Sequence, residues 1–277
     1  MATLYIFGDE SGTMPADDAD PPFVAATVAM LGNPPNLVHG SDDDEKMAEI
    51  FASLSIIPFA AIIMPYPGYG KALRAKYDKI NVMARATRLI TGVTPQYLDE
   101  KTLRDGFDLR NTVWVYAMLQ AIANAVLNTL FTNSVDAVQV ILDRKTMTSS
   151  MRQFFKEMIV NRIAKGTKQF LGSFLPVNPS VVSEWEDRLR FSSKSTAFSW
   201  SDESEEPEKQ FGLRLADRFA HKIYQARVAR QPGIEAILET AGFKGFVRDI
   251  SALVTRLDER LVDNFRKKTG LPEPKEL

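Results

Sequence analysis

The stretch Y-I-F-G-D-E-S-G-T, from Tyr5 to Thr13, runs from a hydrophobic, β-prone segment directly into two adjacent carboxylates. Strands are depleted in Asp, and neighbouring negative charges repel each other. The segment therefore either ends in an exposed turn or holds its carboxylates beside a positive charge. In an extended strand Tyr5, Phe7 and Asp9 lie on one face, and Glu10 points to the other face.

The composition is that of a globular protein with enough apolar residues for a sizeable core. The chain has 277 residues, of which 45% are hydrophobic and 25% charged, and its net charge is −1. It has no cysteine and only two histidines, which excludes a disulfide framework, a thiolate zinc site and a multi-histidine metal site. A near-zero net charge argues against a general DNA-coating protein. No signal peptide is recognisable, so we expect a cytoplasmic protein.

One uncharged segment, Asn111–Val135, is long enough to cross a membrane. However, Gln120, Asn124 and Asn128 recur every four residues and place three amides on one helical face, which is costly in lipid. The pattern predicts a helix buried in the protein core and no membrane partner.

The other hydrophobic patterns alternate between strands and helices. Strands are predicted at Leu4–Asp9, Phe23–Met30, Asn36–His39, Ile56–Met64 and Ala137–Asp143, and helices at 47–54, 71–89, 109–131, 148–165 and 208–228. A further strand is expected within 170–182, and 192–208 is predicted to be a polar loop. The order predicts an α/β fold with a mixed sheet flanked by helices. We expect a core over residues 1–230 with a helical insertion at about 66–107, and a helical C-terminal extension over 231–277.

Two predicted strands end in a carboxylate, at Asp9 and Asp143. Ligands of open α/β sheets gather outside the carboxyl ends of strands, so parallel neighbours would bring these two side chains together. A third acid, Asp217, shares a helical face with Leu213 and Tyr224 and is therefore predicted to point toward the core. A buried carboxylate needs a partner.

That partner could be His221 one turn later, Arg214 or Arg218, or a metal ion shared with Asp9 and Asp143. Three carboxylates form an all-oxygen site, which selects Mg²⁺ or Mn²⁺. Such clusters carry out in-line phosphoryl displacement, in which one ion activates water and a second stabilises the leaving oxygen.

Three motifs together resemble the bacterial and phage family called domain of unknown function 3800. They are Asp9-Glu10-Ser11-Gly12 at the end of the first strand, Asp143-Arg144, and the helical segment Gly212–Asp217. The resemblance spans about residues 3 to 228 and implies a ribonuclease H-like fold and a metal-dependent nuclease activity. It implies Asp9, Asp143 and Asp217 as metal ligands and catalytic residues, with Glu10 as a further catalytic candidate. The sequence departs from the family pattern at Arg214, where the family usually has Gln.

A basic stretch follows the strand at Ile56–Met64. It includes Lys71, Arg74, Lys76 and Lys79, which are predicted to contact the phosphates of a nucleic acid, although a solvated helix face explains them equally well. Lys71 is not a P-loop lysine, because Pro65 stands where that motif needs glycine and Ala72 where it needs Ser or Thr.

Two main functions follow from these patterns. The first is a Mg²⁺- or Mn²⁺-dependent nuclease or phosphodiesterase, and the second is a non-catalytic binding or assembly protein with a degenerate site on the same fold. A metal-dependent phosphatase for a small molecule is a third, weaker option. The C-terminal helical pattern indicates packing on the core or formation of a homo-oligomer.

Overall fold

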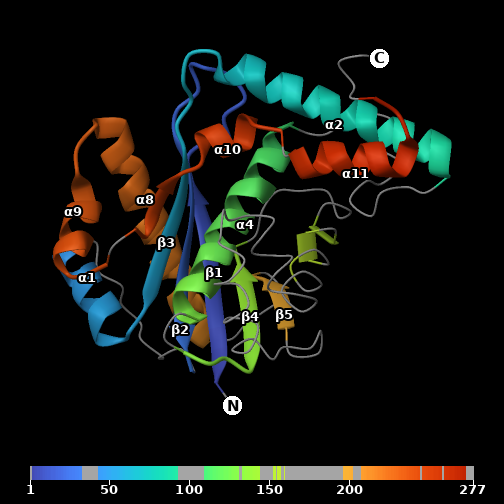
Figure 1. Ribbon diagram of the computed structural model, residues 1–277. Coiled ribbons are helices and arrows are strands. Elements are labelled where there is room, and N and C mark those ends of the chain that lie inside the picture. Colours follow the sequence, from blue (N-terminus) through green and yellow to red (C-terminus); the bar gives the residue numbers. More distant parts are fainter. Residues whose placement is uncertain are drawn as a thin grey trace.

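The computed structural model is an α/β protein with one mixed sheet between two layers of helices (Figure 1). It describes residues 2–32, 43–92, 109–130, 133–143, 152–153, 155–156, 159, 196–201, 207–243, 245–257 and 259–272. The predicted strands at 36–39 and within 170–182, and most of the predicted helix at 148–165, lie outside these residues.

Six strands form the sheet in the described part of the chain, in the order β5-β4-β1-β2-β3-β6. Antiparallel pairing joins β1 to β2 and β2 to β3, whereas β1–β4, β4–β5 and β3–β6 are parallel. Their bounds are β1 Thr3–Ser11, β2 Phe23–Leu31, β3 Ile57–Ile63, β4 Ala137–Leu142, β5 Thr196–Trp200 and β6 Val247–Asp249. The expected mixed sheet is thus confirmed.

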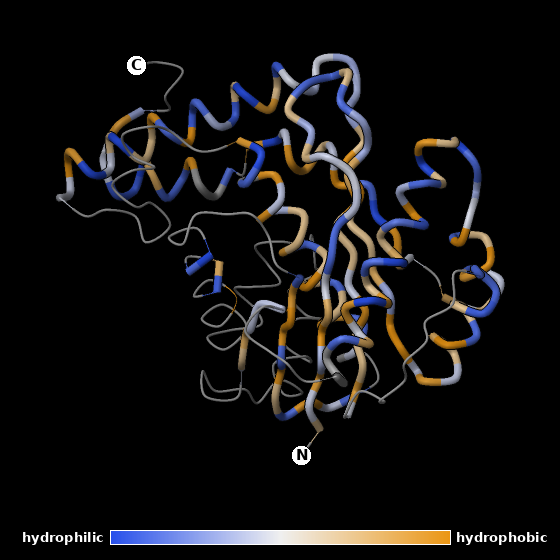
Figure 2. The backbone as a smooth tube through the Cα atoms, turned by 180° about the vertical axis from the view of Figure 1, so that it is seen from behind, coloured by the Kyte–Doolittle hydropathy of each residue, from blue (hydrophilic) through white to orange (hydrophobic). Residues whose placement is uncertain are grey.

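Side-chain alternation along β1 divides the core into two halves. Leu4 and Ile6 point to the face covered by α4 (Leu109–Leu130), α2 (Tyr69–Thr91) and α10 (Ser251–Thr255). Phe7 points to the other face, which is covered by α8 (Pro207–Ala229), α1 (Asp44–Ser53) and α9 (Gly233–Thr240). The central strands carry long hydrophobic stretches in Figure 2, as expected for a sheet buried on both faces.

The uncharged segment forms α4, which crosses the sheet as a core helix. Trp114, Ala121 and Val126 are almost fully buried, and the Thr27 hydroxyl donates a hydrogen bond of 3.3 Å to the Ala121 carbonyl. None of the described helices combines the length and the apolar character that a bilayer crossing requires. The prediction of a buried core helix is therefore confirmed.

Two short strands were not predicted. β5 lies inside the segment expected to be a polar loop, and it pairs in parallel with β4. β6 lies in the C-terminal extension and pairs in parallel with β3, so the extension is not purely helical and completes the sheet at its edge. The same extension continues through α10 into α11 (Glu259–Thr269).

Glycine at position 212 allows α8 to lie directly on β1. A Cβ placed there would be 2.3 Å from two ring atoms of Phe7, whose side chain is fully buried. This close approach fixes the height of α8 along β1, which matters for the polar residues that α8 carries.

We predict that Gly212→Ala lowers the free energy of unfolding by about 1–3 kcal/mol because the added methyl group collides with Phe7. The same change in an ordinary helix interior would stabilise by about 1 kcal/mol. Urea titration measures the difference, and Val228→Ala, at an exposed site on the same helix, is the control with an expected change below about 0.5 kcal/mol. A Gly212→Ala variant as stable as the wild type would contradict this contact.

Candidate functional site

Asp9 and Asp143 occupy adjacent positions on two parallel strands, Asp9 two residues before the end of β1 and Asp143 directly after β4. Gly8 pairs with Leu142 across β1 and β4, and the backbone N–H of Asp143 donates to the Gly8 carbonyl at 3.0 Å. Ile141 packs with Phe7 on the α8 face, so strand alternation directs Asp143 to the face that Asp9 occupies. Adjacent parallel strands are about 4.8 Å apart. Asp9 and Asp143 are therefore neighbours, as expected from the parallel pairing of their strands. Asp9 is half-buried and Asp143 is exposed.

A third strand end contributes Ser201. Because Leu142 pairs with Trp200, the next residues of β4 and β5 are neighbours, and the Ser201 hydroxyl donates to Oδ1 of Asp143 at 2.6 Å. Ser201 thus holds one oxygen of this carboxylate. Sequence reasoning missed this residue because β5 itself was not recognised.

Helix α8 lies over the same edge, and its level is fixed at two points. Gly212 lies against Phe7. Tyr224 lies close to Gly12, since a Cβ placed on Gly12 would be only 2.8 Å from Cε2 of Tyr224. Gly12 also has a φ of 91°, which favours glycine, and it turns the chain away from β1. Asp217 lies between Gly212 and Tyr224 in the helix, at about the level of Asp9.

The expectation that Asp217 points into the core is wrong. The buried face of α8 is formed by Phe211, Leu215, Ala216, Phe219, Ala220 and Ile223, and Asp217 is exposed. Asp217 lies on the flank of α8 that also carries Tyr224, seven residues later. The neighbouring His221 is exposed as well, with Nε2 at 2.8 Å from Nε2 of Gln225.

Glu10 lies on the opposite face of the sheet from Asp9. Its Oε2 accepts a hydrogen bond of 2.9 Å from the indole N–H of Trp114 in α4. Trp114 is buried among aromatic rings, with Phe155 at 5.1 Å and Trp200 at 6.2 Å between ring centroids. Glu10 is therefore on the other side of the sheet from Asp9 and Asp143, and its carboxylate binds a buried side chain of α4.

Within the described ranges, no three acidic or histidine side chains come together in a way that could hold a metal ion. The two adjacent carboxylates of Asp9 and Asp143 are the part of the expected metal site that strand pairing brings together. Two further acids, near the start of α1, have structural contacts: Asp43 caps α1 by accepting the N–H groups of Glu45 and Lys46, and Asp44 forms an ion pair of 2.8 Å with Lys222.

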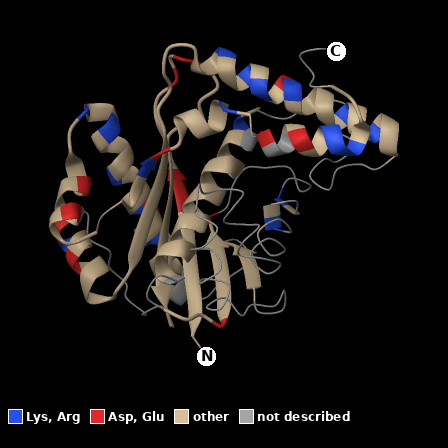
Figure 3. Cartoon of the chain, viewed as in Figure 1, with Lys and Arg blue, Asp and Glu red and all other residues tan. Residues whose placement is uncertain are grey.

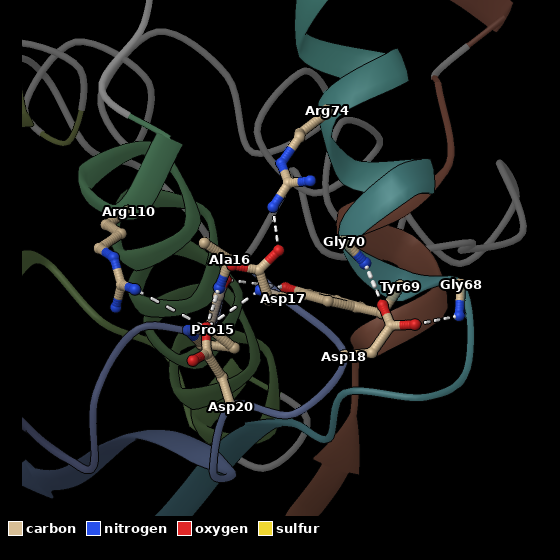
Figure 4. A network of polar contacts seen from close by, with 10 residues as sticks. All are labelled: Pro15, Ala16, Asp17, Asp18, Asp20, Gly68, Tyr69, Gly70, Arg74 and Arg110. Atoms are coloured by element: carbon tan, nitrogen blue, oxygen red, sulfur yellow. Dashed lines mark hydrogen bonds and ion pairs between the residues drawn. The ribbon is translucent and has the colours of Figure 1, made fainter.

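Hydrogen bonds and an ion pair hold the loop that follows β1 against the first turns of α2 and α4 (Figure 4). The Asp18 carboxylate accepts the N–H groups of Gly68 at 2.6 Å and Gly70 at 2.7 Å, which caps the amino end of α2. Arg74 of α2 pairs with Asp17, and Arg110 of α4 donates to the Met14 carbonyl at 2.8 Å. These contacts fix the position of the chain where it leaves β1.

The four predicted nucleic-acid contacts have different surroundings. Lys71 and Arg74 are exposed near the start of α2, and Lys79 is half-buried. Lys76 is only 8% exposed, and its Nζ donates to the carbonyls of Leu253 and Val254, at 3.3 and 2.8 Å, at the carboxyl end of α10. Lys76 is therefore a structural residue that holds α10 against α2 and is not on a phosphate-contacting surface. A cation at a helix carboxyl end stabilises the helix dipole.

No family model, curated protein or solved structure matches this chain. The assignment of a function therefore depends on the residues and their geometry.

We predict a pH-dependent effect of Asp18→Asn on stability. The hydrogen bonds from Gly70 and Gly68 lower the pKa of Asp18 below its usual value. A lowered folded-state pKa stabilises the fold above the unfolded-state pKa, and this contribution is lost as the pH falls through the folded-state pKa, below about pH 4. The variant should have a lower urea midpoint at pH 7, and the difference from wild type should shrink in acid.

The control for this experiment is Asp263→Asn, which removes one negative charge from the exposed face of α11. A difference between Asp18→Asn and wild type that stays constant from about pH 7 to about pH 3 would contradict the capping role.

Proposed function

We propose that the chain is a divalent-metal-dependent phosphodiesterase whose site is built on Asp9 and Asp143. The observation that carries this proposal is the pairing of β1 with β4, which places Asp9, two residues before the end of β1, next to Asp143, directly after β4, on the same face of the sheet. Two adjacent negative charges at an exposed edge repel each other, and a bound cation relieves the repulsion.

The donor set fits a hard cation. Asp9 and Asp143 would hold the ion through carboxylate oxygens, which Mg²⁺ and Mn²⁺ prefer. Asp217, on the flank of α8 at the same level, is proposed as a further ligand. When bound, the ion would supply Lewis acidity and an activated water for attack on a phosphorus centre.

The residues around the carboxylates have distinct proposed roles. The Ser201 hydroxyl orients Asp143 through Oδ1 and leaves Oδ2 to bind the cation. Asp9 has Oδ1 engaged by the N–H of Glu10 at 2.7 Å, which fixes its rotamer in a similar way. Lys71 and Arg74, exposed at the start of α2, are proposed to contact phosphates that flank the reacting one.

We propose a nucleic acid as the substrate and a ribonuclease H-like core as the scaffold. The motif resemblance at Asp9–Gly12, Asp143-Arg144 and Gly212–Asp217 supports both, and the mixed sheet flanked by helices is compatible with that fold. The second candidate is a non-catalytic binding protein on the same scaffold. It is favoured by the position of Asp217, which is exposed on α8 and is not part of the buried face of that helix.

We predict that wild-type protein binds Mn²⁺ with measurable heat in isothermal titration and that Asp143→Asn weakens this binding by about tenfold or more, as expected for loss of a direct ligand. Hydrolysis of labelled single-stranded RNA or DNA should fall in parallel. Asp136→Asn is the matched control because Asp136 precedes the same strand at its other end, where it accepts the N–H of Ala2.

Each other outcome of these measurements supports a different function or a different metal position for this chain. Absence of Mn²⁺ binding in the wild type would contradict the metal site and support the non-catalytic protein. Metal binding with hydrolysis of small phosphoesters but of neither nucleic acid would support a phosphatase. Equal affinities in wild type and Asp143→Asn would place the metal elsewhere.

A further inference from the structure

Helices α2 and α11 together form an arm that extends beyond the sheet (Figure 1). The two helices lie side by side, and both carry many charged residues along their length (Figure 3). Helix α2 has 23 residues and is about 34 Å long, so much of it lies beyond the strands.

The two faces of α2 differ in burial. One face packs inward through Leu73, Lys76, Tyr77, Met83 and Ala84. The opposite face is exposed, and its residues are spaced alternately by four and three along the helix: Lys71, Ala75, Asp78, Val82, Arg85 and Leu89. This set is called the outer stripe below. Its spacing is that of the contact positions in paired helices.

Large apolar side chains on the outer stripe are exposed to solvent. Val82 is 45% exposed and Leu89 is 86% exposed, and Ile90 beside them is 50% exposed. Single exposed apolar residues are normal, but here Ala75, Val82 and Leu89 recur every seven residues along one line. A phosphate backbone would contact Lys71 and Arg85 but would gain nothing from this apolar line.

The outer stripe is complementary to itself when a second copy runs in the opposite direction. With a two-fold axis at Val82, the small Ala75 lies opposite the partner's Leu89, and Asp78 lies within one residue's rise, about 1.5 Å along the axis, of the partner's Arg85. Each of these contacts occurs twice in such a symmetric pair, so one helix supplies both the large and the small residue and both signs of charge. A parallel arrangement would instead place Asp78 beside Asp78 and Arg85 beside Arg85.

We propose that two copies of this chain associate through the outer stripes of their α2 helices, in antiparallel orientation. The interface has an apolar line of Ala75, Val82 and Leu89, with Asp78 and Arg85 fixing direction and register. It is about 21 Å long and only one helix wide, so association depends on protein concentration. This proposal is independent of the chemistry at Asp9 and Asp143.

The first experiment measures the mass of the full chain by analytical ultracentrifugation over about 1–100 µM. Wild-type protein should shift from monomer to dimer, and Leu89→Glu and Val82→Glu should be monomers. Val228→Glu, at a 54% exposed apolar position on α8, is the control and should dimerise like the wild type. Circular dichroism of each variant checks that α2 is still helical.

A charge exchange tests the orientation. Asp78→Arg alone and Arg85→Asp alone should each raise the dimer dissociation constant by about tenfold or more, because both contacts become like-charged. The double variant should restore it. An equimolar mixture of the two single variants should form a heterodimer, because each contact then joins opposite charges.

Three results would overturn the proposal. They are a wild-type protein that stays monomeric throughout the range, a dimer that survives Leu89→Glu and Val82→Glu, and single charge variants whose mixture does not associate. A wild-type monomer that binds single-stranded RNA, with loss of binding in Arg85→Asp, would assign the outer stripe to nucleic acid instead.

Discussion

The parallel pairing of β1 with β4 is the contact on which the rest of the structure depends. Its register places Gly8 opposite Leu142, so the following residues, Asp9 and Asp143, become neighbours. It also leaves β1 with an antiparallel partner, β2, on its other side, so that α8 packs over β1 and β2 on one face of the sheet and α4 packs mainly over β2 and β3 on the other. The carboxylate pair is thus a consequence of how the core is assembled, because buried residues, Phe7 in β1 and Ile141 in β4, lie two positions before each carboxylate on the same face.

The residues near Asp9 and Asp143 are in contact with residues from distant parts of the chain. Ser201 reaches Asp143 because β5 extends the sheet beyond β4, and Asp18 joins the exit of β1 to α2. Gly12 and Tyr224 join that exit to α8. A site supported in this way is held by rigid elements, which favours a fixed position for a bound ion. The arm begins at the same edge and leads away from it, so association through α2 would leave the carboxylates accessible.

Sequence reasoning predicted the local features well and the long-range ones poorly. The alternation that puts Asp9 with Phe7 and opposite to Glu10 follows from strand geometry, and the α4 core helix follows from its lack of charge. β5 and β6 were missed because they are five and three residues long and gain their stability from β4 and β3. Asp217 was misplaced because Leu213 and Tyr224 lie on the flank of α8 and not at its centre. Lys76 could not be recognised as buried, since its carbonyl partners are 177 and 178 residues away in the sequence.

Anomalous scattering from a crystal soaked in Mn²⁺ can show whether Asp9 of β1 and Asp143, directly after β4, bind a cation together. We expect an anomalous peak at about 2.0–2.3 Å from a carboxylate oxygen of Asp9 and from one of Asp143. The peak should be absent in crystals of Asp143→Asn. Mn²⁺ peaks that all lie away from these two carboxylates in a well-diffracting wild-type crystal would rule out the cation site.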